Sequence, residues 1–221
     1  ESRVCSVWKS DLQKRRAALR AVSCGSYLSF GSIGKTWYTR FMIDFSEAAF
    51  SAYLQGTVHA PFVRELAVFG ARWLILGVLV ASGAAAYYEQ GPRTRHGWRE
   101  VGWAVGGAAC LSLALALLIG RERPFQQVAD LVMAWIPAPA SLHSFPSTHT
   151  AAAWAWASGV SWIYRPYAWL WILVALAISI SRVFVGVHFV SDVVGGIVVG
   201  VGAFFLVRVG HSLTEAVIRR V

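Results

Sequence analysis

Charged and proton-transferring residues gather at three places in the second half of the chain. They are Arg121 and Arg123 after one apolar run, Ser147, Thr148 and His149 at the start of the next, and Arg182, His188 and Asp192 between the last two. Guanidinium groups are planar, permanently charged and suited to phosphate oxygens. Imidazoles transfer protons or act as nucleophiles. These residue types together provide for phosphoryl transfer without a metal ion.

The spacing of these residues adds to what their types indicate. Pro146 followed by Ser147 suits the first turn of a helix, where free backbone N–H groups favour an anion. His188 and Asp192 are four residues apart, so they share a face if the turn between them is helical. A carboxylate beside an imidazole fixes the tautomer and orientation of the ring, which prepares it as a nucleophile.

Each of these residues taken alone has a simpler explanation. A single histidine at a membrane interface is usually a polar residue in the headgroup layer, and an arginine at the end of a span usually extends its charged head to water. Asp192 is harder to explain in this way, because an unpaired carboxylate near a membrane is costly. The joint occurrence of these residues on one membrane face is what favours a catalytic site.

The rest of the chain has the composition of a membrane domain. Of its 221 residues, 57% are hydrophobic and 14% are charged, whereas about a quarter are charged in a soluble domain. Charge is absent from long runs such as Val101–Gly120, Pro166–Ser181 and Val193–Val207. They are long enough to cross, or nearly cross, an apolar layer of about 30 Å. We therefore predict an all-α, polytopic transmembrane helix bundle with five to six spans.

The expected elements follow from the apolar pattern. An amphipathic helix over Asp44–Thr57 is predicted to lie along the membrane interface. The five spans expected after it are Leu66–Tyr88, Val101–Ile119, Ser147–Tyr164, Tyr167–Val187 and Val193–Val207. Residues 1–40 are predicted to form a leader of uncertain order, with a weak extra span as the alternative, and residues 41–221 the membrane domain.

The arginines determine the expected orientation. Five spans place three basic segments on one side: the loop 89–100, the turn at Arg165, and the C-terminus with Arg208, Arg219 and Arg220. The positive-inside rule makes that side cytoplasmic, so the candidate site faces the extracytoplasmic side. The net charge of +9 is assigned to such flanking arginines and not to nucleic-acid binding, because no basic stripe alternates with exposed aromatic residues.

Three segments resemble the signatures of the type 2 phosphatidic-acid-phosphatase (PAP2) superfamily. Ser181-Arg182, followed after five residues by His188 and after three more by Asp192, resembles the third signature. Pro146-Ser147-Thr148-His149 is similar to the second signature, Pro-Ser-Gly-His. Arg123-Pro124 matches the end of the first signature. The span pattern extends this likeness to most of the chain after residue 44.

The departures from the signatures are informative. The Lys that opens the first signature falls on Ala116, and Arg121 is the candidate to replace its charge in part. An Arg-Pro-Phe ending without that Lys, followed by Ser-Phe-Pro-Ser-x-His-Thr and Val-Gly-Val-His, resembles the bacterial undecaprenyl-diphosphatase branch. The resemblance therefore implies a multi-pass protein of the bacterial inner membrane, with a lipid phosphate of the bilayer as substrate.

The resemblance also implies a role for each residue. His188 attacks phosphorus and forms a phosphohistidine, Asp192 orients and polarises His188, and His149 protonates the leaving group and then activates water. The phosphoryl oxygens are held by Arg123, Arg182, Ser147 and Thr148, with Arg121 as a further candidate. We expect no metal and no cofactor, and the three cysteines lack metal-ligand spacing.

Several alternatives stay open at this point. Undecaprenyl diphosphate is the leading substrate, and phosphatidylglycerol phosphate, phosphatidic acid and lipid A phosphates are the others. An anion transporter would place its polar residues near the membrane midplane in broken helices, whereas these residues sit at span ends. A haloperoxidase-like use of the same oxyanion pocket is disfavoured by the five spans.

Overall fold

A computed structural model of the chain describes residues 46–47, 49–56, 60–89, 91–127, 132–137 and 143–218. Apart from Ser46, these residues belong to one compact unit that begins at Glu47. Every regular element in them is a helix, which confirms the predicted all-α bundle. The predicted leader, residues 1–40, lies outside the described residues, and its separation from the membrane domain stays a prediction.

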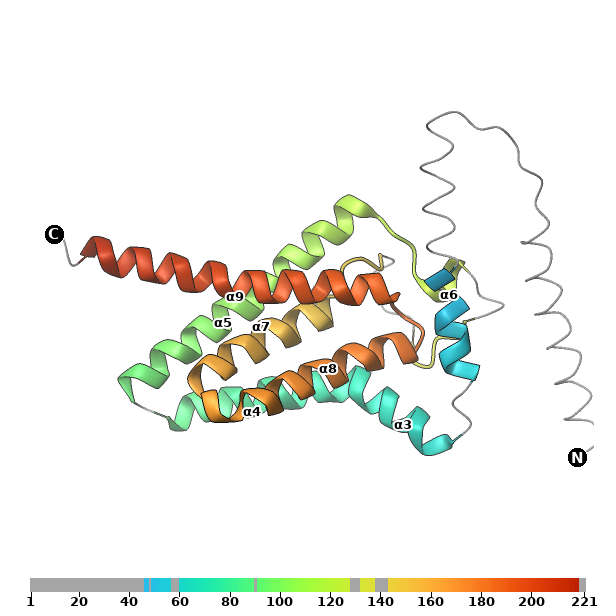
Figure 1. The fold of residues 1–221 in the computed structure, drawn as a ribbon, viewed down its shortest axis with the longest axis horizontal. Coiled ribbons are helices and arrows are strands. Elements are labelled where there is room, and N and C mark those ends of the chain that lie inside the picture. Colours follow the sequence, from blue (N-terminus) through green and yellow to red (C-terminus); the bar gives the residue numbers. More distant parts are fainter. Residues whose placement is uncertain are drawn as a thin grey trace, which may run out of the picture. The chain divides into compact units, whose positions relative to one another are not determined.

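The helices follow one another with short connections. Residues 49–56 are helical. After them come α3 (Pro61–Phe69), the π-helix η1 (Gly70–Leu74), α4 (Ile75–Tyr88), α5 (Pro92–Ile119), α6 (Pro124–Gln127), α7 (Thr148–Ile163), the 3-10 helix η2 (Arg165–Tyr167), α8 (Ala168–Phe184) and α9 (Val190–Ile218). Figure 1 shows α5, α7, α8 and α9 lying side by side, with α4 along α8 and α3 leading away at an angle near the end of α8.

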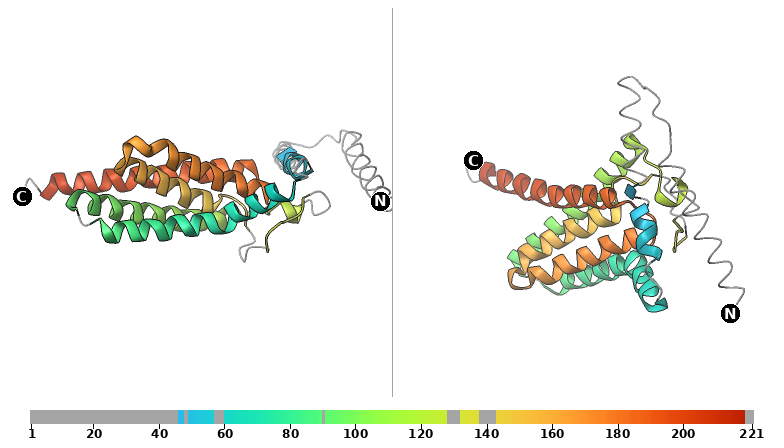
Figure 2. Two further views of the ribbon diagram at one scale, coloured as in Figure 1. Left: turned by 90° about the horizontal axis from the view of Figure 1, so that it is seen from below. Right: turned by 45° about the vertical axis from the view of Figure 1, so that its right-hand side comes forward.

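Four helical stretches are long and apolar enough to cross a membrane: Pro61–Tyr88, Thr94–Gln127, Arg165–Phe184 and Val190–Val217. They correspond to four of the five predicted spans. The remaining span corresponds to α7, whose 16 residues extend about 24 Å. This helix packs against α5, α8 and α9 (Figure 2), and nine of its 16 residues are buried.

Two helices extend further than the sequence predicted. α5 begins at Pro92 and not at Val101, and α9 continues past Val207 to Ile218. The extension places a carboxylate inside the bundle, because Glu100 is only 5% exposed. Arg208 compensates it by donating hydrogen bonds of 3.1 and 2.8 Å to its two carboxylate oxygens. Charges that the sequence pattern places at span ends therefore pair within the helices.

Glycines allow α9 to approach α7 closely. A Cβ at Gly200 would lie 2.3 Å from the carbonyl oxygen of Ala151, and one at Gly196 would lie 2.7 Å from that of Ser147. Small residues at such positions let helix backbones touch in a membrane. The approach also joins the starts of the two helices, where the Ser147 N–H donates to the Asp192 carbonyl at 3.0 Å.

Candidate active site

Two glycines turn the chain into the site. Gly120 ends α5 with φ of +63°, and Gly186, just after α8, has φ of +76°. A side chain at Gly186 has no room, because a Cβ there would lie 2.8 Å from the Met133 carbonyl oxygen. Glycine adopts this left-handed conformation at little cost. After these turns, Arg123 lies next to His188 and Arg121 lies next to Asp192.

His188 is held in one tautomer by the backbone. Its Nδ1 lies 2.8 Å from the carbonyl oxygen of Ser144, and the ring is buried. A carbonyl can only accept a hydrogen bond, so Nδ1 carries the proton and Nε2 carries the lone pair. Nε2 lies 3.4 Å from Nη1 of Arg123. The nitrogen of this imidazole that carries the lone pair, Nε2, therefore faces a guanidinium group.

The surroundings of His188 keep its ring neutral. Burial lowers the pKa of His188 to about 4, and the guanidinium groups of Arg182 and Arg123 act in the same direction, against the raising effect of the Asp192 carboxylate. A neutral imidazole has the lone pair that attack on phosphorus requires. The burial that makes this residue hard to protonate therefore keeps it available as a nucleophile near neutral pH.

Asp192 lies on the Nδ1 side of the His188 ring and is fully buried. Its Oδ2 is 3.6 Å from the Nδ1 of His188, and it accepts hydrogen bonds from the Phe189 N–H at 2.8 Å and from the Ser144 hydroxyl. Ser144 thus contacts both residues, the histidine through its carbonyl and the aspartate through its hydroxyl. Sequence reasoning gave Ser144 no role, although this residue opens the Ser-Phe-Pro-Ser-x-His-Thr segment that carries part of the resemblance.

Two further arginines lie close to the two histidines, Arg123 beside His188 and Arg182 in one pocket with His149. Arg123 is buried and donates to the Val187 carbonyl at 3.0 Å. Arg182 is also buried and donates from Nη1 to the Ala71 carbonyl, in the π-helix η1, at 2.8 Å. The Nε of Arg182 has no hydrogen-bond partner among the described residues. A buried N–H without a partner is costly, so this group is suited to an anionic ligand.

His149 and Arg182 line one pocket of about 280 Å³. The other lining residues come from η1 and the helices around it and from the loop 132–137; they are Ala71, Arg72, Trp73, Leu76, Ile136 and Pro137. Trp73 and Leu76 are 55% and 52% exposed on the outer side of their helix. The pocket therefore connects a cationic interior with an apolar surface.

Ser147 and Thr148 lie at the N-terminus of α7. Ser147 is the N-cap residue, and its hydroxyl accepts a hydrogen bond of 3.1 Å from Thr150. The first turn of a helix leaves backbone N–H groups, here those of Thr148 and His149, without an acceptor inside the helix. Such groups, together with the helix dipole, favour an anion at this end.

Arg121 differs from the other two arginines in its partners. Its Nη1 lies 2.7 Å from Oδ1 of Asp192, and its Nη2 lies 2.9 Å from Oε2 of Glu47. The guanidinium also stacks over the Phe189 ring, 4.2 Å from its centre. The structure thus brings Arg121 to the acidic side of the site, whereas Arg123 and Arg182 lie toward His188 and His149.

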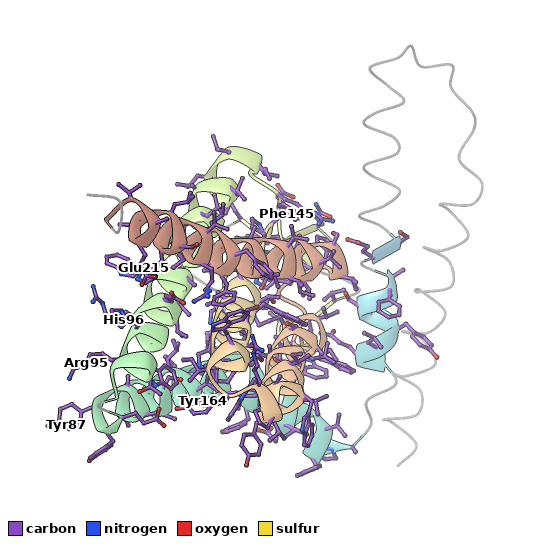
Figure 3. All side chains as sticks on the ribbon, turned by 60° about the vertical axis from the view of Figure 1, so that its left-hand side comes forward. Tyr87, Arg95, His96, Phe145, Tyr164 and Glu215 are labelled. Carbon is purple, nitrogen blue, oxygen red and sulfur yellow. The ribbon has the colours of Figure 1, made fainter. Side chains whose placement is uncertain are left out.

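The three basic segments that were used to orient the chain meet at the other end of the bundle. Arg165, Arg208, His96 and His211 line one cavity of about 810 Å³ there. In Figure 3, Arg95, His96, Tyr164 and Glu215 lie together, away from Phe145 of the site segment. The 28 residues of α5, about 42 Å, separate the two ends.

Comparisons with known proteins agree with the sequence signatures. The model of the PAP2 superfamily matches residues 97–214. The chain is 34% identical over 96 residues to undecaprenyl-diphosphatase BcrC of Bacillus subtilis, which is 43% of this chain and 48% of that protein. It is thus aligned with about half the length of that relative.

A second relative is matched over more of its length. The chain is 31% identical over 143 residues to decaprenylphosphoryl-5-phosphoribose phosphatase of Mycobacterium tuberculosis, covering 62% of this chain and 72% of that protein. The fold is similar to that of a transmembrane PAP2-type phosphatidylglycerolphosphate phosphatase from Bacillus subtilis, with a TM-score of 0.55, 23% identity, and 79% and 95% of the two chains covered. The extent of these matches confirms the resemblance, and the chain belongs to the PAP2 superfamily.

Proposed function

We propose that this chain hydrolyses undecaprenyl diphosphate to the monophosphate through a phosphohistidine at His188. Membership of a phosphatase superfamily supports a phosphoric-ester hydrolase. The observation that carries the proposal is the orientation of His188, whose Nδ1 is engaged by the Ser144 carbonyl at 2.8 Å while its Nε2 lies 3.4 Å from Arg123. A nucleophile beside a phosphate-binding cation is what phosphoryl transfer requires.

In the first step, Nε2 of His188 attacks the terminal phosphorus. The N–P bond forms as the bond from phosphorus to the bridging oxygen breaks. The negative charge of the bound substrate favours a protonated His149. His149 then gives its proton to that oxygen, and the lipid monophosphate leaves. Arg123, the free Nε–H of Arg182 and the N–H groups at the start of α7 stabilise the charge on the phosphoryl oxygens.

In the second step, water replaces the histidine. The now neutral His149 takes a proton from water as its oxygen attacks phosphorus, and the P–N bond breaks. Inorganic phosphate leaves, and both histidines return to their starting states. The Asp192 carboxylate, 3.6 Å from Nδ1, stabilises the positive charge that the His188 ring acquires while it carries phosphate.

The choice of a polyprenyl lipid rests on two considerations. Two relatives are named for undecaprenyl and decaprenyl-linked substrates. The 280 Å³ pocket also opens beside Trp73 and Leu76, on the apolar face of a candidate membrane span, which suits a lipid chain that stays in the bilayer while its head group reacts. Phosphatidylglycerol phosphate, phosphatidic acid and lipid A phosphates share the head-group chemistry and are the alternative substrates.

The proposed location is the bacterial inner membrane, with the site on the extracytoplasmic face. The candidate spans and the membrane relatives support a membrane protein. The sidedness follows from the arginines at the end of the bundle opposite to His188.

A substrate panel tests this function. Purified protein would be given undecaprenyl diphosphate, phosphatidylglycerol phosphate and phosphatidic acid, with and without EDTA, and phosphate release would be measured. We expect the highest kcat/KM with undecaprenyl diphosphate, no loss on chelation, and no release by His188→Ala. A preference for another lipid would change the substrate, and a requirement for magnesium would refute the mechanism.

A further inference from the structure

The guanidinium of Arg121 bridges two carboxylates behind the reacting atoms. Its Nη1 donates to Oδ1 of Asp192 at 2.7 Å and to the Ser191 hydroxyl at 2.5 Å, and its Nη2 donates to Glu47 at 2.9 Å. Arg121 is 9% exposed and Asp192 is fully buried. A charge-assisted contact of this length in a buried setting holds both side chains in place.

Glu47 anchors this arrangement from the segment that precedes the first span. Its carboxylate accepts hydrogen bonds from the Ser191 hydroxyl at 2.7 Å and from the Ser191 N–H at 3.2 Å. Glu47 therefore contacts Arg121 and the start of α9 at the same time. One guanidinium that bridges two carboxylates carries no surplus positive charge of its own for a phosphate.

Arg121 reaches the histidine by a second route, through its main chain. Its carbonyl oxygen accepts the Ser144 N–H at 2.7 Å, and the Ser144 carbonyl in turn accepts Nδ1 of His188 at 2.8 Å. The Ser144 carbonyl that orients His188 and the Asp192 carboxylate that supplies charge beside it are thus tied to one residue.

We propose that Arg121 is a positioning residue, which, together with Glu47, sets Asp192 and Ser144 against His188, and that it does not bind the substrate phosphate. This inference rests on the proposed phosphohistidine mechanism. The cations of the site then have different roles, since Arg123 and Arg182 face the substrate and Arg121 faces the carboxylates. Without Arg121, two neighbouring carboxylates would lose the cation that bridges them, and their repulsion would turn Asp192 away from His188.

The test compares two arginines that stand two residues apart. Arg121→Met, Arg121→Lys and Arg123→Met would be assayed with p-nitrophenyl phosphate, and the inhibition constant of inorganic phosphate would be measured for each. We expect Arg121→Met to lower kcat roughly 10- to 100-fold, the size of loss found when the residues that orient metal ligands are removed. Its inhibition constant for phosphate should stay near that of the unsubstituted protein. Arg123→Met should raise that constant.

Arg121→Lys keeps a cation beside Asp192 but loses the fork that spans both carboxylates. It should recover part of kcat, again with unchanged phosphate inhibition, and it serves as the informative variant if Arg121→Met does not fold. Glu122→Gln, an exposed change between the two arginines, is the matched control and should keep full activity. A rise in the phosphate inhibition constant in either Arg121 variant, or an unchanged kcat in Arg121→Met, would overturn the proposal.

The same experiments distinguish a wrong substrate assignment from a wrong role for Arg121. Neither p-nitrophenyl phosphate nor inorganic phosphate has a lipid chain. If the unsubstituted protein hydrolyses the aryl phosphate but not undecaprenyl diphosphate, the lipid assignment fails while the role of Arg121 is still decided. If neither ester is hydrolysed, calorimetric titration of phosphate into the Arg121 and Arg123 variants gives the same comparison: weaker binding in Arg121→Met would refute the inference.

Discussion

His188 and Ser144 are joined by a hydrogen bond of 2.8 Å, from the ring Nδ1 of the histidine to the main-chain carbonyl of the serine. A main-chain carbonyl accepts a hydrogen bond but never takes the proton at neutral pH. Asp192, with Oδ2 at 3.6 Å, lies beyond hydrogen-bonding distance of the same nitrogen. The backbone therefore fixes the tautomer, and the carboxylate contributes chiefly its charge.

Because the Ser144 carbonyl fixes the tautomer and Asp192 contributes charge, we predict that Asp192→Asn lowers kcat only moderately. Where a carboxylate alone fixes the tautomer of a catalytic histidine, its conversion to an amide costs roughly 10,000-fold in kcat. Here the Ser144 carbonyl would still hold the tautomer, so we expect a smaller loss, measured as kcat with an aryl phosphate. The Ser144→Ala change keeps the carbonyl and removes only the hydroxyl, and its loss should be smaller again. A loss in Asp192→Asn as large as that in His188→Ala would contradict this view.

Substitution of the two histidines should lower turnover in different ways as the leaving group of the substrate is changed. His188→Ala removes the nucleophile, so no phosphoenzyme should form with any substrate. His149→Ala removes the acid, which typically contributes about 100- to 10,000-fold. A diphosphate or an aryl phosphate needs that acid less than an alkyl monophosphate, because its leaving group departs more readily.

Rapid-quench trapping of labelled phosphohistidine checks both expectations. The decrease in kcat caused by His149→Ala, relative to the unsubstituted protein, should be largest for the alkyl monophosphate. Equal losses for all three substrates would remove His149 from the acid role. A labelled phosphoenzyme that persists in His188→Ala would place the nucleophile elsewhere.

The acid side of the pH profile should reflect the buried state of His188. Its pKa is lowered to about 4, chiefly by burial. The ring is protonated and unreactive below that value and neutral above it, so the nucleophile should be lost only as pH falls toward 4. The kcat/KM for an aryl phosphate reports groups of the free enzyme. After correction for substrate ionisation, measured by phosphorus NMR, it should show no histidine step near 6.5 from His188.

Much of the site could be predicted because its residue types are unusual for their setting. Arg182, His188 and Asp192 stand out at the end of uncharged spans, and the four-residue spacing of His188 and Asp192 predicts that these two lie close together. Ser144 and Glu47 could not be found in this way. A serine in a loop and a glutamate in an amphipathic helix are common, and their contacts depend on chain segments that only the packed structure brings together.

The same limit applies to the helix ends. Arg99 and Glu100 come directly before an uncharged run, so the span was predicted to begin at Val101. The helix in the structure includes both residues, because the Glu100 carboxylate is paired with Arg208, which lies 108 residues further along the sequence. Charge patterns along a sequence indicate where a helix meets water only when no distant partner compensates the charge.

Sidedness can be tested with cysteine labelling in a variant without its three native cysteines. Met133, near the site, is 69% exposed, and Arg95, at the other end of the bundle, is also exposed. An impermeant maleimide added to intact spheroplasts should label Met133→Cys, and it should label Arg95→Cys only after permeabilisation. The reverse pattern would invert the proposed topology.

The close approach of α7 and α9 predicts a strong difference between two glycines on one helix. A Cβ at Gly200 would meet the Ala151 carbonyl oxygen at 2.3 Å and the Ala155 nitrogen at 2.9 Å, whereas one at Gly202 would meet nothing within 4 Å. Backbone atoms cannot move aside as the end of a side chain can. Gly200→Ala should therefore separate the two helices, and an overpacked contact of this kind typically costs about 1–3 kcal/mol.

The separation should also reach the site, because the Ser147 N–H and the Asp192 carbonyl are joined at 3.0 Å where the two helices begin. We expect Gly200→Ala to lower the thermal unfolding temperature in detergent and to reduce kcat. Gly202→Ala is the matched control on the same helix, and it should leave both unchanged or raise stability slightly, because alanine favours a helix more than glycine. Equal behaviour of the two variants would mean that this helix contact does not support the site.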